Sequence, residues 1–101
     1  MKILSVIVPC FNEEQALPFF YEEIKKISVK MKDVSFEYLF IDDGSNDNTL
    51  SVIKKYSEMD ERIKYISFSR NFGKESAMYA GLKNSSGDYA VLLDADLQHP
   101  P

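Results

Sequence analysis

Two aspartates follow the last apolar run of the chain. Residues 89–93 read Tyr-Ala-Val-Leu-Leu, and Asp94 and Asp96 come next, separated by Ala95. Side chains two positions apart on a strand point to the same face, so we expect both carboxylates to converge at the carboxyl end of a buried strand. Two carboxylates that lie close together repel each other unless protons or a cation neutralise them. Because a magnesium ion held by carboxylates also binds phosphate oxygens, the pair predicts a site for a metal-bound diphosphate.

Paired aspartates also open a polar loop after an earlier apolar run. Asp42 and Asp43 lead into residues 44–49, which are rich in residues that bend the backbone and cap helices. An EF-hand calcium loop starting at Asp43 is excluded, because Asn48 replaces its glycine and Lys54 its final glutamate. A capped turn explains the asparagines and the serine but not the paired aspartates. Two interpretations therefore stay open: a turn alone, or a carboxylate that faces the hydrogen-bond donors of a ligand.

The expected elements alternate between strands and helices. Apolar or alternating runs predict strands at residues 3–8, 36–41, 62–68 and 89–93, the third nearer an edge because it is half polar. Helical periodicity predicts one helix between each pair of strands. This order indicates right-handed crossovers and a mainly parallel sheet in a three-layer α/β fold. The polar clusters after the first, second and fourth strands then share one edge of the sheet.

Each expected helix has a face that we predict to be buried. Asn12 and Gln15 resemble a capping box that starts the first helix near Glu13, with Pro18 in its first turn. The inward positions are Leu17, Phe20, Tyr21, Ile24, Ile27 and Met31 in the first helix, Leu50, Ile53 and Ser57 in the second, and Ala77, Ala80, Gly81 and Asn84 in the third. The small residues of the third helix predict that it lies close to the sheet.

The composition is that of an ordinary soluble globular domain. At 101 residues, with 45% hydrophobic and 28% charged residues, the chain forms one domain at most. A net charge of −4 without a basic cluster argues against nucleic-acid binding. No apolar run approaches the ~20 residues needed to span a membrane. The single cysteine, Cys10, excludes an internal disulfide and is expected to be buried and inert, with a reduced cytoplasmic setting as the default.

Several common phosphate-binding motifs are missing. No Gly-x-Gly-x-x-Gly fingerprint follows the first strand, and Gly73 and Lys74 lack the preceding glycine and the following hydroxyl residue of a P-loop. An aspartyl-phosphate hydrolase with Asp94 as its nucleophile fits poorly, because Gln98 stands where that class has Thr or Val. Arg70 and Lys74 either bind a phosphate or are ordinary solvated charges, and both interpretations stay open.

Five segments occur together in an order that resembles a known family. They are residues 8–14 (Val-Pro-Cys-Phe-Asn-Glu-Glu), 41–49 (Ile-Asp-Asp-Gly-Ser-Asn-Asp-Asn-Thr), 71–82 beginning Asn-Phe-Gly-Lys, 86–89 (Ser-Gly-Asp-Tyr) and 94–101 (Asp-Ala-Asp-Leu-Gln-His-Pro-Pro). Together they resemble the N-terminal, nucleotide-binding half of a family-two inverting glycosyltransferase with the GT-A fold. The most similar branch is that of dolichyl-phosphate mannose synthase and the bacterial undecaprenyl-phosphate glucosyltransferases.

The resemblance implies a nucleotide-sugar site that contains Mg²⁺ or Mn²⁺. The residues that correspond to the nucleotide-binding positions of the family are Pro9, Phe11, Glu13, Ile41, Asp42, Asp43, Asp94, Ala95 and Asp96. Phe11 stands where many members have Tyr, so a hydroxyl contact is lost. Asp96 is the favoured metal ligand, Asp94 lies near the ribose or the metal, and Gln98 lies beside the metal.

The resemblance also implies a UDP-sugar or GDP-sugar donor and a polyprenyl-phosphate acceptor at the cell envelope. A lipid phosphate is already ionised near neutral pH, so no strong general base is needed. Because the chain stops at Pro101 beside its most charged site, we expect residues 1–101 to be the donor-binding part of a longer catalytic domain. We expect this part to bind nucleotide without transferring sugar. Any contact with the inner face of the cell membrane would come from segments beyond it, and an uncovered sheet edge would favour self-association.

Overall fold

The computed structural model describes residues 2–98, and strands and helices alternate throughout that range. The elements are β1 (Lys2–Cys10), α1 (Leu17–Lys30), β2 (Val34–Asp42), α2 (Thr49–Met59), β3 (Ile63–Ser67), α3 (Lys74–Asn84), β4 (Tyr89–Leu92) and a short 3₁₀ helix, η1 (Ala95–Gln98). The alternation expected from the sequence is confirmed. Within residues 2–98, no helix is long and apolar enough to cross a membrane.

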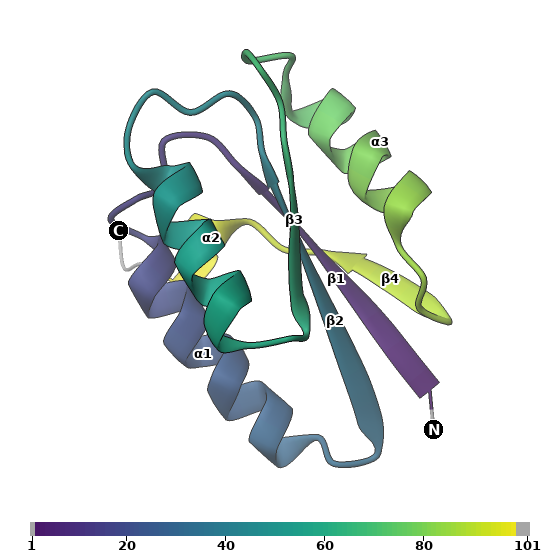
Figure 1. Cartoon of the computed structure of the whole chain (residues 1–101). Coiled ribbons are helices and arrows are strands. Elements are labelled where there is room, and N and C mark those ends of the chain that lie inside the picture. Colours follow the sequence, from purple (N-terminus) through teal and green to yellow (C-terminus); the bar gives the residue numbers. More distant parts are fainter. Residues whose placement is uncertain (1, 99–101) are drawn as a thin grey trace.

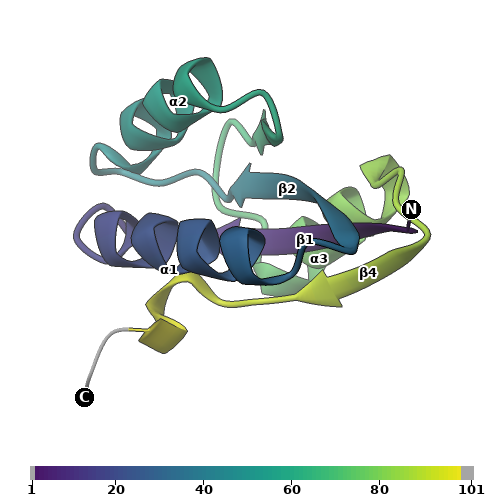
Figure 2. The same cartoon turned by 90° about the horizontal axis from the view of Figure 1, so that it is seen from below.

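The sheet is fully parallel and has the strand order β3-β2-β1-β4. Helices α1 and α2 cover one face of this sheet, and α3 covers the other, so the fold has three layers (Figures 1 and 2). The position of β3 at an edge agrees with its half-polar sequence. Because the strands are parallel, the segments that follow β1, β2 and β4 emerge at the same edge, as predicted.

The larger part of the core lies between the sheet and the helices α1 and α2. Its aromatic contacts include an edge-on pair of Phe20 and Phe40, with ring centroids 6.0 Å apart, and a stacked pair of Tyr21 and Tyr56 at 4.1 Å. The inward face of α2 differs from the prediction, because Tyr56 is buried while its neighbour Ser57 is only half-buried. The stacking partner on α1 explains this difference, since the aromatic contact stabilises the turn of α2 that buries Tyr56.

The opposite face of the sheet is covered by α3 at close range. Ala77 and Gly81 are buried against the sheet, and a Cβ atom at Gly81 would lie 2.4 Å from Cγ2 of Ile7. The prediction that small residues allow close approach is therefore confirmed for these two positions. It is wrong for Asn84, which is exposed and whose side-chain amide donates a hydrogen bond to the Ala80 carbonyl within the helix.

The start of α1 differs from the sequence-based expectation. The helix begins at Leu17 rather than near Glu13, although Pro18 does lie in its first turn. Asn12 has a φ of 55°, in the left-handed region, and therefore does not cap this helix. Ile27 and Met31 at the far end are 37% and 44% exposed, so the buried stripe of α1 ends at Ile24.

The strand β4 is more exposed than its apolar sequence suggests. All four of its residues are exposed, including Tyr89 at 61% and Val91 at 38%. The expectation that this strand is buried was wrong, because β4 lies at the edge of this sheet and α3 packs over β1 and β2 instead. The apolar residues of β4 thus form an uncovered surface within the described residues.

A buried carboxylate fastens the α3–β4 loop to the sheet. Glu37 in β2 is 7% exposed. It accepts hydrogen bonds from Ser5 Oγ at 2.7 Å and from the backbone N–H of Ser86 at 3.0 Å, and Lys64 Nζ lies 3.3 Å from its other oxygen. Burial alone would raise the pKa of Glu37, but the hydrogen bonds from Ser86, Ser5 and Lys64 outweigh it and lower the pKa to about 2.

The depressed pKa of Glu37 predicts a loss of stability in acid. The unfolded chain takes up this proton near the ordinary pKa of 4.5 and the folded chain only near 2, so the contribution is complete above pH 4.5 and is lost as the pH falls toward 2. We expect the free energy of unfolding to fall by at most about 3 kcal/mol from this group. Urea unfolding between pH 6 and about pH 2 measures it. Glu37→Gln should remove this part of the pH dependence, whereas the exposed control Glu61→Gln should retain it.

Candidate functional site

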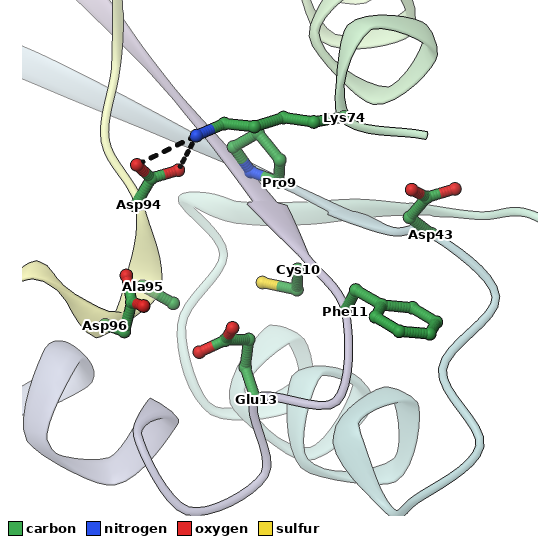
Figure 3. A pocket seen from close by; sticks show the side chains of 9 residues that line it. All are labelled: Pro9, Cys10, Phe11, Glu13, Asp43, Lys74, Asp94, Ala95 and Asp96. Atoms are coloured by element: carbon green, nitrogen blue, oxygen red, sulfur yellow. Dashed lines mark hydrogen bonds and ion pairs between the residues drawn. The ribbon is translucent and has the colours of Figure 1, made fainter. Parts of the chain in front are cut away.

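A cleft of about 210 Å³ lies at the carboxyl ends of β1, β2 and β4 (Figure 3). Its lining residues are Pro9, Cys10, Phe11, Glu13, Asp43, Lys74, Asp94, Ala95 and Asp96. Seven of these are residues that the sequence predicted, and Cys10 and Lys74 are the additions. Asp94 and Asp96 lie on one side of the cleft, and Phe11 and Asp43 lie on the other (Figure 3).

Two predicted site residues, Ile41 and Asp42, do not line this cleft. Ile41 is fully buried in the core beneath α3, and Asp42 is 2% exposed and accepts a hydrogen bond from the backbone N–H of Ser45. Gln98 lies in η1, but the position of its side chain is outside the described part of the structure. His99, which belongs to the last of the five sequence segments, also lies outside residues 2–98.

Asp94 and Asp96 reach the cleft from a turn rather than from a strand. β4 ends at Leu92, and Ala95 begins η1, so the expected strand geometry for the two aspartates was wrong. Ala95 is 2% exposed and packs into the larger core cluster. Because this buried alanine anchors the turn, the aspartates on either side of it lie at the surface of the cleft.

Pro9 lies within β1, so the prediction from the sequence that Pro9 ends the first strand is wrong. The Ile7 carbonyl accepts a hydrogen bond from the Leu93 N–H on the β4 side, and the Cys10 carbonyl accepts one from the Asp43 N–H on the β2 side. Pro9 therefore faces the β4 side, beyond the last residue of β4, where no ladder hydrogen bond requires its missing N–H. This position leaves the proline ring at the floor of the cleft.

Lys74 pairs directly with Asp94. Its Nζ atom lies 2.7 Å from Oδ1 and 2.9 Å from Oδ2 of Asp94, and this pair raises the pKa of Lys74 (Figure 3). The sequence left open whether Lys74 and Arg70 were ordinary solvated charges. The structure places Lys74 in the cleft, while the Arg70 guanidinium lies 4.7 Å from the ring centroid of Phe72.

Glu13 brings a third carboxylate to the same side of the cleft as Asp94 and Asp96. It lies between β1 and α1, and its backbone N–H donates to Oγ1 of Thr49 at 2.8 Å. Burial raises the pKa of Glu13, and the charges of Asp96, Asp94 and Asp47 raise it further. The clustered negative charge therefore favours a bound cation or proton near these carboxylates.

Cys10 lines the cleft, but its thiol is expected to be unreactive. It is 2% exposed, and burial together with the nearby carboxylates of Glu13, Asp42 and Asp94 raises the pKa of its thiol. The thiol stays protonated at neutral pH and is a poor nucleophile. This agrees with the expectation of a buried, inert cysteine.

The polar loop after β2 is fastened to the loop after β1 by hydrogen bonds. The Asn12 N–H donates to Ser45 Oγ at 2.9 Å, and the Asn46 N–H donates to Asn12 Oδ1 at 2.8 Å. The carboxylate of Glu14 accepts from the backbone N–H and the side-chain amide of Asn48. These hydrogen bonds give most of the polar residues of the loop a structural role. They support the interpretation of residues 45–48 as a turn.

Asp43 binds a different partner, the loop that precedes α3. Its Oδ1 accepts a hydrogen bond from the Phe72 N–H at 2.8 Å, and its Oδ2 accepts from the Gly73 N–H and the Asn71 side-chain amide, both at 3.1 Å. Asp43 thus lines the cleft and also positions the residues next to Lys74. No local pattern in the sequence indicated this pairing, because the partners are 28 to 30 positions apart.

The sequence of this chain matches a protein-family model over residues 5–101, and the description of that model is glycosyl transferase family 2. The chain belongs to glycosyl transferase family 2. Membership agrees with the resemblance read from the five segments. It also sets aside the aspartyl-phosphate hydrolase, which had only the Asp94-Ala95-Asp96 sequence in its favour.

Curated sugar transferases resemble the chain along nearly its whole length. The chain is 46% identical over 100 residues to a bactoprenol glucosyl transferase of Shigella phage SfV. This alignment covers 99% of the chain and 32% of the phage protein. The chain is 38% identical over 99 residues to an undecaprenyl-phosphate 4-deoxy-4-formamido-L-arabinose transferase of Proteus mirabilis, covering 97% of this chain and 30% of that protein. The chain therefore spans about a third of the length of these curated relatives.

Solved structures share the fold of this chain. TarS 1–349 of S. aureus in complex with UDP superposes with a TM-score of 0.80 at 29% identity, covering 95% of this chain and 28% of that one. The mannosyltransferase PcManGT of Pyrobaculum calidifontis, in complex with GDP-Man and Mn²⁺, superposes with a TM-score of 0.70 at 26% identity, covering 92% of this chain and 27% of that one. The expected GT-A-like α/β architecture is thereby confirmed.

The carboxylates of this family 2 chain suit one particular kind of metal site. Among the described side chains, no group of three or more His, Cys, Asp or Glu residues is arranged to hold a metal ion. Mg²⁺ is usually held by one or two carboxylates together with substrate phosphates rather than by a cage made only of protein. Asp94 and Asp96 supply two such carboxylates, so their oxygen donors fit a Mg²⁺ or Mn²⁺ ion that is bound together with a diphosphate.

Proposed function

We propose that this protein is the donor-binding part of a glycosyltransferase that moves a sugar from a UDP- or GDP-sugar to a polyprenyl phosphate. The observation that carries the proposal is the cleft in which Asp94, Asp96, Glu13 and Lys74 meet at the carboxyl ends of the strands. The polyprenyl acceptor is supported by relatives whose names specify bactoprenol and undecaprenyl phosphate. The donor is supported by the UDP and GDP-Man complexes of the structural neighbours.

In the proposed reaction the cleft holds the nucleoside diphosphate while it leaves the sugar. Asp94, Asp96 and Gln98 would hold a Mg²⁺ or Mn²⁺ ion, which as a Lewis acid stabilises negative charge on the leaving phosphate oxygens. Lys74 supplies a positive charge on the same side. Because Asp94 and Asp96 are assigned to the cation, neither serves as the nucleophile. The ionised lipid phosphate attacks the anomeric carbon directly, and the nucleoside diphosphate leaves.

The remaining cleft residues would bind the nucleoside. Phe11 is 40% exposed and presents an aromatic face, and Pro9 forms an apolar floor beside it. Glu13 and Asp43 contribute acceptors for the hydroxyl and amide groups of the nucleotide. Ile41 and Asp42 would contribute indirectly, because both are buried and fix the position of the end of β2.

The 101-residue chain would bind the donor without completing the transfer. The chain corresponds to about a third of the curated relatives, so the acceptor site, any general base and any membrane contact belong to the parent enzyme. A polyprenyl-phosphate acceptor would place that enzyme at the inner face of the cell membrane. Turnover of a UDP- or GDP-sugar by residues 1–101 with lipid phosphate present would contradict this division.

A panel of nucleoside diphosphates tests the proposal through thermal stability. At a ligand concentration about 100 times Kd, binding stabilises the folded state by about 2.7 kcal/mol, which raises Tm by roughly 10–20 °C in a domain of this size. We expect such a shift for UDP or GDP with Mn²⁺ and a much smaller one with EDTA. ADP serves as the control for base selectivity. Unchanged Tm values with UDP, GDP and Mn²⁺ would refute donor binding.

A further inference from the structure

Lys74 is the only cationic side chain among the nine residues that line the cleft. The same lining includes the carboxylates of Glu13, Asp43, Asp94 and Asp96. Lys74 Nζ contacts both oxygens of Asp94, at 2.7 and 2.9 Å. The ammonium group of Lys74 therefore already neutralises one of the two carboxylates to which the divalent cation is assigned.

The main chain of Lys74 is fixed by the preceding loop, while its side chain is exposed to solvent. Lys74 is the first residue of α3, and the carboxylate of Asp43 accepts hydrogen bonds from the two preceding backbone N–H groups, those of Phe72 and Gly73. The lysine side chain is 58% exposed, and Asp94 is its partner at the tip. A flexible four-carbon stem on a fixed base allows the ammonium to change partners without a change in the fold.

We propose that Lys74 is a built-in counter-ion that makes cation binding depend on the diphosphate. In the ligand-free protein, Lys74 neutralises Asp94, so a divalent cation that arrives alone competes with the ammonium for the carboxylate. When a nucleoside diphosphate is present, Lys74 exchanges the Asp94 carboxylate for phosphate oxygens and leaves Asp94 to the cation. The inference rests on the proposed function, because it assumes that the cleft binds a nucleoside diphosphate.

The exchange couples the two ligands thermodynamically. A cation that binds alone must break the ion pair between Lys74 and Asp94, and the lost ion pair weakens its binding. When a diphosphate is present, the Lys74 ammonium forms a new ion pair with phosphate oxygens, which compensates for that loss. By linkage, the nucleotide must then strengthen cation binding by the same factor by which the cation strengthens nucleotide binding. Lys74 therefore acts on the cation through Asp94 and on the nucleotide through its phosphates, and its removal should affect the two ligands in opposite directions.

The test measures Mn²⁺ binding directly from the electron paramagnetic resonance signal of the free ion. Mn²⁺ is titrated into the 101-residue chain alone, with UDP and with GDP, for the wild type, Lys74→Met and Lys74→Arg. Titrations of UDP and GDP without protein correct for the Mn²⁺ that the nucleotides bind themselves. Lys83→Met is the matched control, because Lys83 is an exposed lysine in the last turn of the same helix. Circular dichroism checks that each variant is folded.

We expect nucleotide to tighten Mn²⁺ binding to the wild type by about tenfold or more. Lys74→Met should bind Mn²⁺ alone more tightly than the wild type, and nucleotide should tighten its Mn²⁺ binding much less. Lys74→Arg should largely restore the coupling, and Lys83→Met should behave as the wild type. If folded Lys74→Met binds Mn²⁺ alone no more tightly than the wild type, the counter-ion role is wrong. If neither nucleotide affects Mn²⁺ binding to the wild type, the proposed function fails together with it.

Discussion

Replacing Asp96 with alanine is expected to abolish the cation-dependent binding of UDP or GDP by this chain. Asp96 is exposed at the mouth of the cleft, and in the described structure no ammonium or guanidinium group pairs with its carboxylate. It is therefore the carboxylate most available to a divalent cation. With only two carboxylates assigned to the cation, loss of one should weaken Mn²⁺-dependent nucleotide binding by about 100-fold or more. Isothermal titration of UDP and GDP in the presence of Mn²⁺ measures the effect.

The control for this substitution is Asp33→Ala. Asp33 is exposed in the turn before β2, at the opposite end of that strand from the cleft, so its loss changes the net charge without touching the site. Asp33→Ala should leave the affinity unchanged. Asp96→Ala that retains wild-type affinity for the nucleotide with Mn²⁺ would remove Asp96 from the metal site and would leave the proposed cation binding without its main ligand.

Replacing Gly44 with alanine is expected to cause a large loss of stability. Gly44 has a φ of 70°, and a Cβ atom there would lie 2.2 Å from the carbonyl carbon of Arg70 and 2.4 Å from the backbone nitrogen of Asn71. The cost combines left-handed backbone strain with an overlap that only a backbone movement relieves. We expect the free energy of unfolding to fall by about 4 kcal/mol, which denaturant titration measures.

Gly73→Ala is a matched control that separates the two causes. Gly73 has a φ of 105°, but no heavy atom lies within 4 Å of a Cβ built at this position. This variant should show the cost of backbone strain alone, about 1–3 kcal/mol. Equal losses for the two variants would show that contact with residues 70 and 71 does not matter. If Gly44→Ala does fold, the displaced loop should also move Lys74 away from Asp94 and alter Mn²⁺ binding.

The layered architecture was predictable from the sequence because its signals are local and periodic. The near-continuous apolar run at residues 3–8 indicates a strand covered on both faces, and the mostly apolar run at residues 36–41 indicates a second strand. Helical spacing between them requires a crossover between parallel strands. The location of the site then follows from topology alone, since the carboxyl ends of parallel strands share one edge. This is why seven of the nine predicted nucleotide-site residues lie in one cleft.

The local geometry of the site was harder to predict than its location. The alternation rule placed Asp94 and Asp96 on a strand, yet β4 ends at Leu92 and the buried Ala95 turns the chain. Asn12 had the right residue type for a helix cap but adopts a left-handed conformation and bonds to the loop after β2 instead. In both places, contacts with distant segments outweigh the local preference of the residues.

The amino-acid sequence alone determined the order of the elements, the family and the edge of the sheet at which the acidic residues gather. Only the tertiary structure decided which partner each charged group has. Lys74 and Asp94 are 20 positions apart, and Asp43 and Phe72 are 29 positions apart. A contact between two loops has no period along the chain, because it depends on where the sheet and α3 bring those loops in space. The ion pair that gives Lys74 its proposed role is therefore a property of the fold.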